Sequence, residues 1–93
     1  MYALSARLTF HLHHSNSLKD KRQVRRSLIE KTKNRFNASI AEVDTQDTHR
    51  TLTIGIALVS GDIAYAQKAL DEIIRYMEEH VDGELLDAEV RGI

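Results

Sequence analysis

The 93 residues suffice for one domain with one hydrophobic core, and 42% apolar with 29% charged residues is a globular balance, not a disordered one. The chain contains no cysteine, which excludes a disulfide framework, a thiol nucleophile and a cysteine-ligated metal site. No apolar run approaches the roughly 20 residues that cross a bilayer, so we expect a single cytoplasmic domain over residues 1–93 without membrane contact.

The net charge of −1 hides a strong separation of charge along the chain. Between Lys19 and Arg35, eight Lys and Arg residues stand against two carboxylates, which is a net charge of +6. The remainder of the chain therefore carries −7. A basic segment within an acidic chain is a candidate contact for a polyanion.

The first half of the chain predicts a strand, a helix and a second strand. Residues 2–12 alternate between apolar and mostly small or polar side chains, the period of a half-buried strand. Ser17 is a good helix N-cap, and Asp20 three residues later makes a near capping box. An apolar stripe at helical spacing then continues to about Arg35, with Arg25 at its edge. Residues 38–43 read as a short strand.

The second half repeats this order. Residues 51–59 alternate clearly and follow a polar turn at 44–48, so we expect a hairpin with the preceding strand. The turn Ser60-Gly61-Asp62 leads into a helix whose apolar residues recur at i, i+3, i+4 and i+7 as far as Val81. After Asp82-Gly83, a last strand is expected to direct Leu86, Ala88 and Val90 to one face.

The order βαββαβ has one dominant compact solution, because each helix must be a right-handed crossover between parallel strands. Interleaving the two units gives an α+β, ferredoxin-like sandwich: a four-stranded antiparallel sheet in order 4-1-3-2 with both helices on one face. The opposite face has no helix cover and carries small or polar residues on strands one and three, which suits water or a second sheet.

Two segments carry a family resemblance. The segment Ser17-Leu18-Lys19-Asp20-Lys21-Arg22, followed by Arg35-Phe36-Asn37-Ala38-Ser39-Ile40-Ala41-Glu42-Val43, resembles the YlxP-like family of small uncharacterised bacterial proteins. The resemblance implies a ferredoxin-like fold, no established enzymatic activity, and a role near RNA or the ribosome. The chain departs from the family at Arg25, where an apolar residue is usual.

The basic helix is the main candidate site. Phosphate groups are bound by point charges, forked guanidinium donors and the free N–H groups of a helix N-terminus. We therefore predict that phosphate or nucleic acid contacts Ser17, Lys19, Lys21, Arg22, Arg26 and Lys33. The alternative is a solvated face that is partly neutralised by the acidic second helix, through Asp71, Glu72, Glu78 and Glu79.

Two further groups have competing interpretations. His11, His13 and His14, with His49 nearby, are a possible metal set, but exposed polar histidines are the commoner case, and we predict no metal or cofactor. Glu42 near the hairpin turn could do acid–base work. If Glu42 is partly buried it needs a partner, and a basic residue of the first helix is the expected one.

No P-loop, nucleophile elbow or glycine-rich dinucleotide turn is present, so we expect no catalysis. The favoured hypothesis is a non-catalytic RNA- or ribosome-associated module that contacts phosphate backbone through the first helix. The alternative is a homo-oligomeric interaction module or small-ligand sensor with no nucleic-acid role. A homodimer fits both hypotheses.

Overall fold

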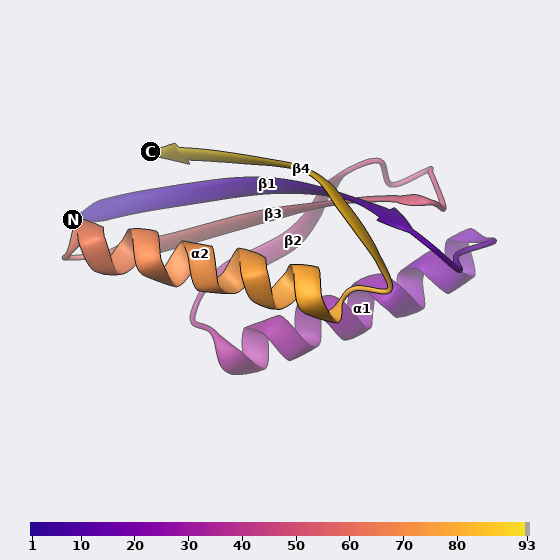
Figure 1. The fold of residues 1–93 in the computed structure, drawn as a ribbon, viewed down its shortest axis with the longest axis horizontal. Helices are drawn as coiled ribbons and strands as arrows, with labels where there is room; N and C mark the ends of the chain where they lie inside the picture. Colours follow the sequence, from indigo (N-terminus) through magenta and orange to yellow (C-terminus); the bar gives the residue numbers. More distant parts are fainter. Residues whose placement is uncertain (93) are drawn as a thin grey trace.

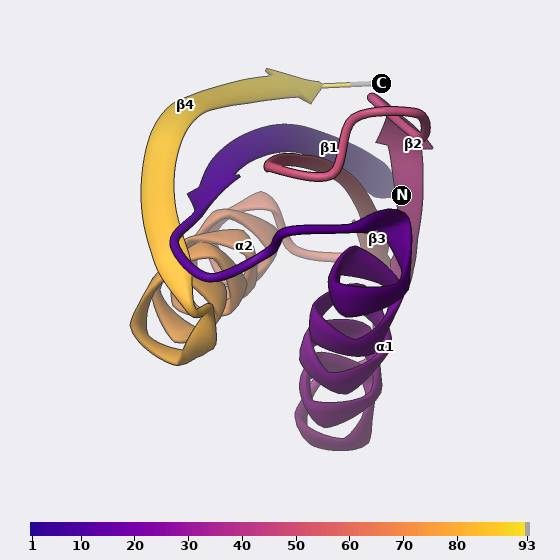
Figure 2. The same ribbon diagram turned by 90° about the vertical axis from the view of Figure 1, so that its right-hand side faces the viewer.

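The computed structural model describes residues 1–92 and has the predicted order of elements. These elements are β1 (Tyr2–Leu12), α1 (Leu18–Arg35), β2 (Ser39–Asp44), β3 (Thr51–Ser60), α2 (Ile63–His80) and β4 (Gly83–Gly92). The strands form one antiparallel sheet in the order β2-β3-β1-β4, and both helices lie on one face of it (Figures 1 and 2). The predicted ferredoxin-like sandwich is confirmed.

The first helix begins after the predicted N-cap Ser17, and the second begins directly after the predicted turn, with Asp62 as its N-cap. The Ser17 Oγ accepts a hydrogen bond from the backbone N–H of Asp20 at 3.1 Å. The Asp62 carboxylate accepts from the N–H groups of Ala64 and Tyr65. Each cap satisfies N–H groups that have no partner within the helix, which explains why the helices begin where they do.

The core lies between the sheet and the two helices. Alternate residues of β1 and β3 supply most of it, as their period of two predicts, and α2 contributes its apolar stripe. The fully buried large side chains of this core include Leu8, Phe10, Leu12, Leu52, Ile54, Ile56, Leu70, Ile73 and Met77. No helix among the described residues is long and apolar enough to cross a membrane.

The last strand differs from its predicted facing. The register between β1 and β4 shifts after Thr9, because β4 contains one extra residue at this point. Leu85 rather than Leu86 therefore stands opposite Phe10 and packs against the core, and Leu86 is 58% exposed. A β-bulge reverses the alternation locally, so a strict period of two gives the wrong face for Leu86.

The uncovered face of the sheet carries the expected small and polar residues, and β1 and β3 place Ser5, Arg7 and Thr9 opposite Ala57, Gly55 and Thr53. Arg7 is paired with Asp44 at 2.7 Å across this face.

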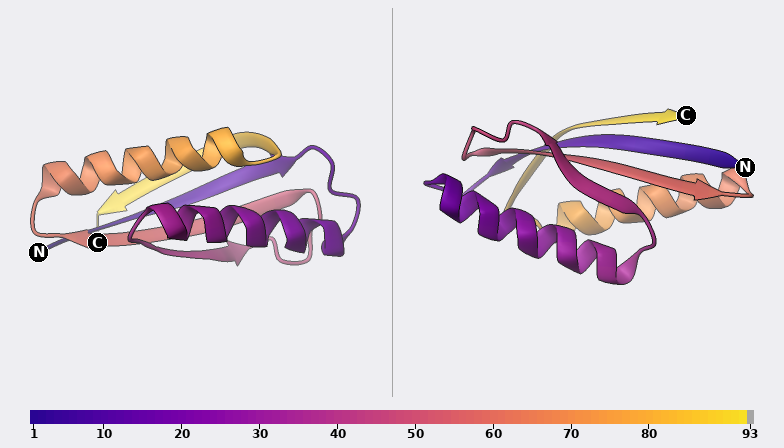
Figure 3. Two further views of the ribbon diagram at one scale, coloured as in Figure 1. Left: turned by 90° about the horizontal axis from the view of Figure 1, so that it is seen from below. Right: turned by 180° about the vertical axis from the view of Figure 1, so that it is seen from behind.

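Seen from the helix side, α1 and α2 lie side by side and antiparallel over the strands (Figure 3). The two helices therefore form a layer of their own, and residues of both line grooves between them.

Candidate nucleic-acid interface

Four cations of α1 lie along one exposed side of the helix. These cations are spaced three, four and seven residues apart, which places them on one side of a helix. They are Lys19, Arg22, Arg26 and Lys33. All four are exposed. Within residues 1–92, no carboxylate lies within 4.0 Å of any of their charged groups. We call these four residues the cationic stripe.

The cationic stripe lies on the side of α1 that is turned away from α2. The side of α1 that faces α2 is identified by Val24, Leu28 and Lys31, which line a groove together with His80 and Val81 at the C-terminal end of α2. At 100° per residue, Arg22 and Arg26 lie roughly half a turn away from these positions. Among the described residues, the carboxylates of α2 form no ion pair with the stripe, which argues against the alternative prediction of partial neutralisation.

Lys21 does not belong to the exposed site, contrary to the prediction. Its side chain is 3% exposed, and its ammonium lies 2.8 Å from Oε2 of Glu42. The same ammonium donates hydrogen bonds to the backbone carbonyls of Thr45 and, at 2.7 Å, Thr48. The ammonium is thus buried among two carbonyl groups and a carboxylate, so it is not available to a phosphate group.

The predicted structural role of Glu42 is confirmed. Its side chain is 7% exposed and contacts two cations of α1, Lys21 and Arg25, the latter at 3.0 Å. Its Oε2 accepts no well-aligned hydrogen bond from described residues, so the contact with Lys21 is an ion pair by distance. We call Lys21, Arg25 and Glu42 the buried ion triad. It joins α1 to the edge strand β2.

The triad also holds the loop between β2 and β3. Thr45 in this loop has a positive φ of 57°, which is rare for a β-branched residue. Its hydroxyl bonds to Asp44, Thr51 and Thr53, and its carbonyl accepts from Lys21. The loop thus has several fixed attachments to α1 and to the sheet.

The loop between β2 and β3 places a further cation near α1, and sequence analysis did not assign this cation to the site. Arg50 donates a hydrogen bond at 2.9 Å to Oδ1 of Asn16, just before the N-terminus of α1, and it is exposed. It therefore adds a fifth cation at the N-terminal end of the helix that carries the stripe. No spacing in the sequence links Arg50 to Asn16, because hairpin closure and the triad create the proximity.

The N-terminus of α1 offers less to an anion than predicted. Ser17 Oγ already accepts the N–H of Asp20, and the Asp20 carboxylate accepts the N–H of Asn16 at 3.0 Å. The carboxylate also places a negative charge at the positive end of the helix dipole. The Ser17 hydroxyl can still donate its hydrogen to a phosphate group, but the cations of the stripe are the main groups that could bind phosphate.

The histidines near the end of β1 do not assemble a recognisable metal site. The rings of His11 and His13 have centroids 6.2 Å apart, and His14 contacts the Asp82 carboxylate at 3.0 Å. Within residues 1–92, no three His, Asp or Glu side chains are grouped so that they could hold a metal ion.

The state of Glu42 predicts how stability varies with pH. Burial raises the pKa of Glu42, but hydrogen bonds and charge from Lys21 and Arg25 outweigh burial, so the pKa lies below its ordinary value of 4.5. A carboxylate with a lowered pKa stabilises the fold above its unfolded-state pKa, and this contribution is lost as pH falls through the folded-state value. We expect the difference in unfolding free energy between wild type and Glu42→Gln to be constant from pH 7 to pH 6 and to shrink below about pH 4.5.

Urea unfolding at several pH values measures this difference. Glu42→Gln keeps every other carboxylate, so their contributions to unfolding cancel in the difference between the two proteins. Only the titration of position 42 remains in this difference. A difference that stays constant down to pH 3 would contradict the assignment.

Comparison with known proteins places the chain in a family and confirms the fold. A family model described as "Protein of unknown function (DUF503)" matches residues 4–90. The "Uncharacterized protein YlxP" of Bacillus subtilis strain 168 is 33% identical over 67 residues, which cover 72% of this chain and 73% of that protein. A de novo designed protein with a ferredoxin fold, solved by solution NMR, superposes with a TM-score of 0.58 at 14% identity. The superposition covers 100% of this chain and 84% of the designed one, and it bears on the fold alone.

Proposed function

We propose that this chain, which belongs to the DUF503 family of proteins of unknown function, is a non-catalytic module that binds the phosphate backbone of RNA, free or in the ribosome, through α1. One observation carries the proposal: the cationic stripe is exposed and has no carboxylate within ion-pair distance among the described residues. Unpaired cations on a rigid helix meet phosphate groups with little loss of existing contacts.

The spacing of the stripe suits a nucleic-acid strand. Arg22 and Lys33 are eleven residues apart, which corresponds to about 16 Å along a helix. Charges spread over this length can contact successive phosphates of one strand, whereas a single small anion would reach only one or two of them. Arg50 extends the same charged surface beyond the N-terminal end of α1.

The predicted mode of binding is independent of base sequence. Aromatic residues are only 5% of the chain, and the uncovered faces of β1 and β3 carry Ser5, Arg7, Thr9, Thr53 and Ala57 rather than aromatic side chains. Stacking platforms for bases need aromatic rings on such a face. We therefore propose contacts with the phosphate backbone only, made in the cytoplasm. The uncovered face of the sheet remains free for a second copy of the chain in a proposed dimer.

Filter binding to a single-stranded oligouridine tests the proposal through its salt dependence. Neutralising Z phosphates on a single strand releases counterions and gives a slope of about −0.7Z in a plot of log affinity against log salt. The four cations of the stripe predict a slope of about −3, and Arg50 would make it slightly steeper. A duplex of equal length shows whether single strands are preferred.

A slope near zero would contradict the proposal, because binding without counterion release does not use phosphate contacts. Affinity purification from cells, with and without nuclease, then tests the proposal in its natural setting. We expect ribosomal particles or RNA-containing complexes to be recovered, and we expect nuclease treatment to remove them.

A further inference from the structure

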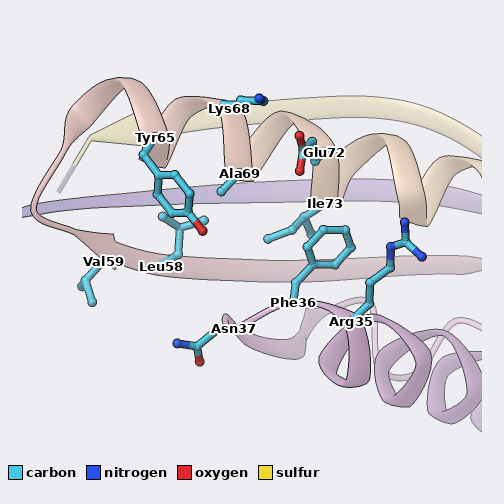
Figure 4. A pocket seen from close by; sticks show the side chains of 10 residues that line it. All are labelled: Arg35, Phe36, Asn37, Leu58, Val59, Tyr65, Lys68, Ala69, Glu72 and Ile73. Atoms are coloured by element: carbon cyan, nitrogen blue, oxygen red, sulfur yellow. The ribbon is translucent and has the colours of Figure 1, made fainter.

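The groove between the helices holds a cleft on the other side of α1 from the cationic stripe. It has a volume of about 350 Å³ and lies where the C-terminal end of α1 meets the first half of α2, over the end of β3. This volume is within the range of sites for small organic ligands. Figure 4 shows the side chains that line it.

Two aromatic rings flank this cleft. Tyr65 projects from the first turn of α2 towards Leu58, and Phe36 rises from the end of α1 towards Ile73 (Figure 4). Phe36 is held in place by an edge-to-face contact with Tyr76, with ring centroids 5.5 Å apart. Tyr65 is 65% exposed and has no hydrogen-bond partner for its hydroxyl among the described residues. An apolar floor between two rings suits a flat aromatic group.

Charged groups stand at the rim of the same cleft. Arg35 reaches towards α2 from α1, and Lys68 and Glu72 come from successive turns of α2 (Figure 4). The Arg35 guanidinium packs 5.3 Å from the centre of the Tyr76 ring, which orients it. None of the three has an ion-pair partner within residues 1–92. The rim thus offers the Arg35 guanidinium for an anion and the Glu72 carboxylate for hydrogen-bond donors, and Lys68 extends along the upper side of α2, away from Arg35 (Figure 4).

We propose that this cleft binds a mononucleotide, with the base between Tyr65 and Phe36, the phosphate at Arg35, and sugar hydroxyls or a base amino group at Glu72. A mononucleotide combines a flat ring, an anion and several donors in one small molecule. The occupant is a free nucleotide rather than a residue of a bound RNA strand. A strand on the cationic stripe runs along the opposite side of α1 and does not pass the cleft.

The test is a titration of ¹⁵N-labelled protein with AMP, GMP, CMP and UMP, followed through the amide signals of Tyr65, Ala69 and Ile73. We expect saturable shifts at these amides with at least one nucleotide below about 5 mM. Adenosine and inorganic phosphate are the comparison ligands. We expect each to bind at least about tenfold more weakly than AMP, because each lacks one of the two recognised parts.

Two variants connect the binding to the cleft. Tyr65→Ala and Arg35→Gln alter exposed side chains, and each is expected to weaken binding about tenfold. Arg91→Gln, an exposed position on β4 away from the cleft, is the matched control and should leave the affinity unchanged. The proposal is overturned if no nucleotide saturates the shifts, if inorganic phosphate binds as tightly as AMP, or if the three variants bind alike. None of these outcomes bears on RNA binding by the stripe, so the two proposals can fail separately.

Discussion

The substitution Glu42→Gln is expected to lower the free energy of unfolding by about 3 kcal/mol at pH 7, because it leaves a buried ammonium without its counter-charge. Lys21 and Glu42 have side chains that are 3% and 7% exposed, so water cannot replace the lost carboxylate. Loss of one partner of a buried pair typically costs 3–5 kcal/mol. The two carbonyls that Lys21 retains place the expected value at the lower end of this range. Urea unfolding followed by circular dichroism measures the change.

Two further variants separate the ion pair from the packing. Arg25→Gln removes the outer cation, whose side chain is 32% exposed, and should cost no more than about 1 kcal/mol. The double variant Lys21→Met with Glu42→Leu removes both buried charges and should recover most of the stability lost by Glu42→Gln. The carbonyls of Thr45 and Thr48 that it frees belong to a surface loop and can bind water. A cost below about 0.5 kcal/mol for Glu42→Gln would show that the triad is not important for stability.

Reversing two charges of the stripe is expected to have the largest effect on RNA binding. The double variant Arg22→Glu with Arg26→Glu removes two phosphate contacts and adds two repulsive charges at the centre of the stripe. We expect the affinity for oligouridine to fall roughly 100-fold at moderate salt. The salt slope should become shallower by at least about 1.4, because each lost phosphate contact on a single strand removes about 0.7 from it. Both side chains are exposed and unpaired, so the fold should be preserved.

The matched control has the same change in net charge at a different place. Arg75 lies on α2 and Arg91 lies on β4, both exposed and away from the stripe. The double variant Arg75→Glu with Arg91→Glu should weaken binding only slightly, through the general field of the protein. Equal losses in the two double variants would mean that net charge, and not the stripe, determines binding. Unchanged affinity after the stripe is reversed would exclude α1 as the contact.

The residues of the candidate site show where prediction from sequence succeeds and fails. Lys19, Arg22, Arg26 and Lys33 are exposed as predicted, since their positions lie off the apolar stripe of the helix. Lys21 precedes Val24 by three residues and Leu28 by seven, so helical periodicity places it on the buried side, while its charge alone predicts exposure. The partner that makes burial possible, Glu42, is 21 residues away in β2. Sequence reasoning assigned Glu42 a basic partner from this helix but did not identify which one.

The sequence by itself determined the elements, their order and the sheet topology of this protein, because period, caps and turns are local and because few compact arrangements satisfy βαββαβ. Only the tertiary structure decided which cations remain free. Pairing of β2 with β3 brought Glu42 beneath α1, where it buries Lys21 and pairs with the partly exposed Arg25. It likewise set Arg50 beside Asn16, and the bulge in β4 exchanged Leu86 for Leu85 in the core. These outcomes depend on contacts between residues far apart in the chain, whose energies no local pattern contains.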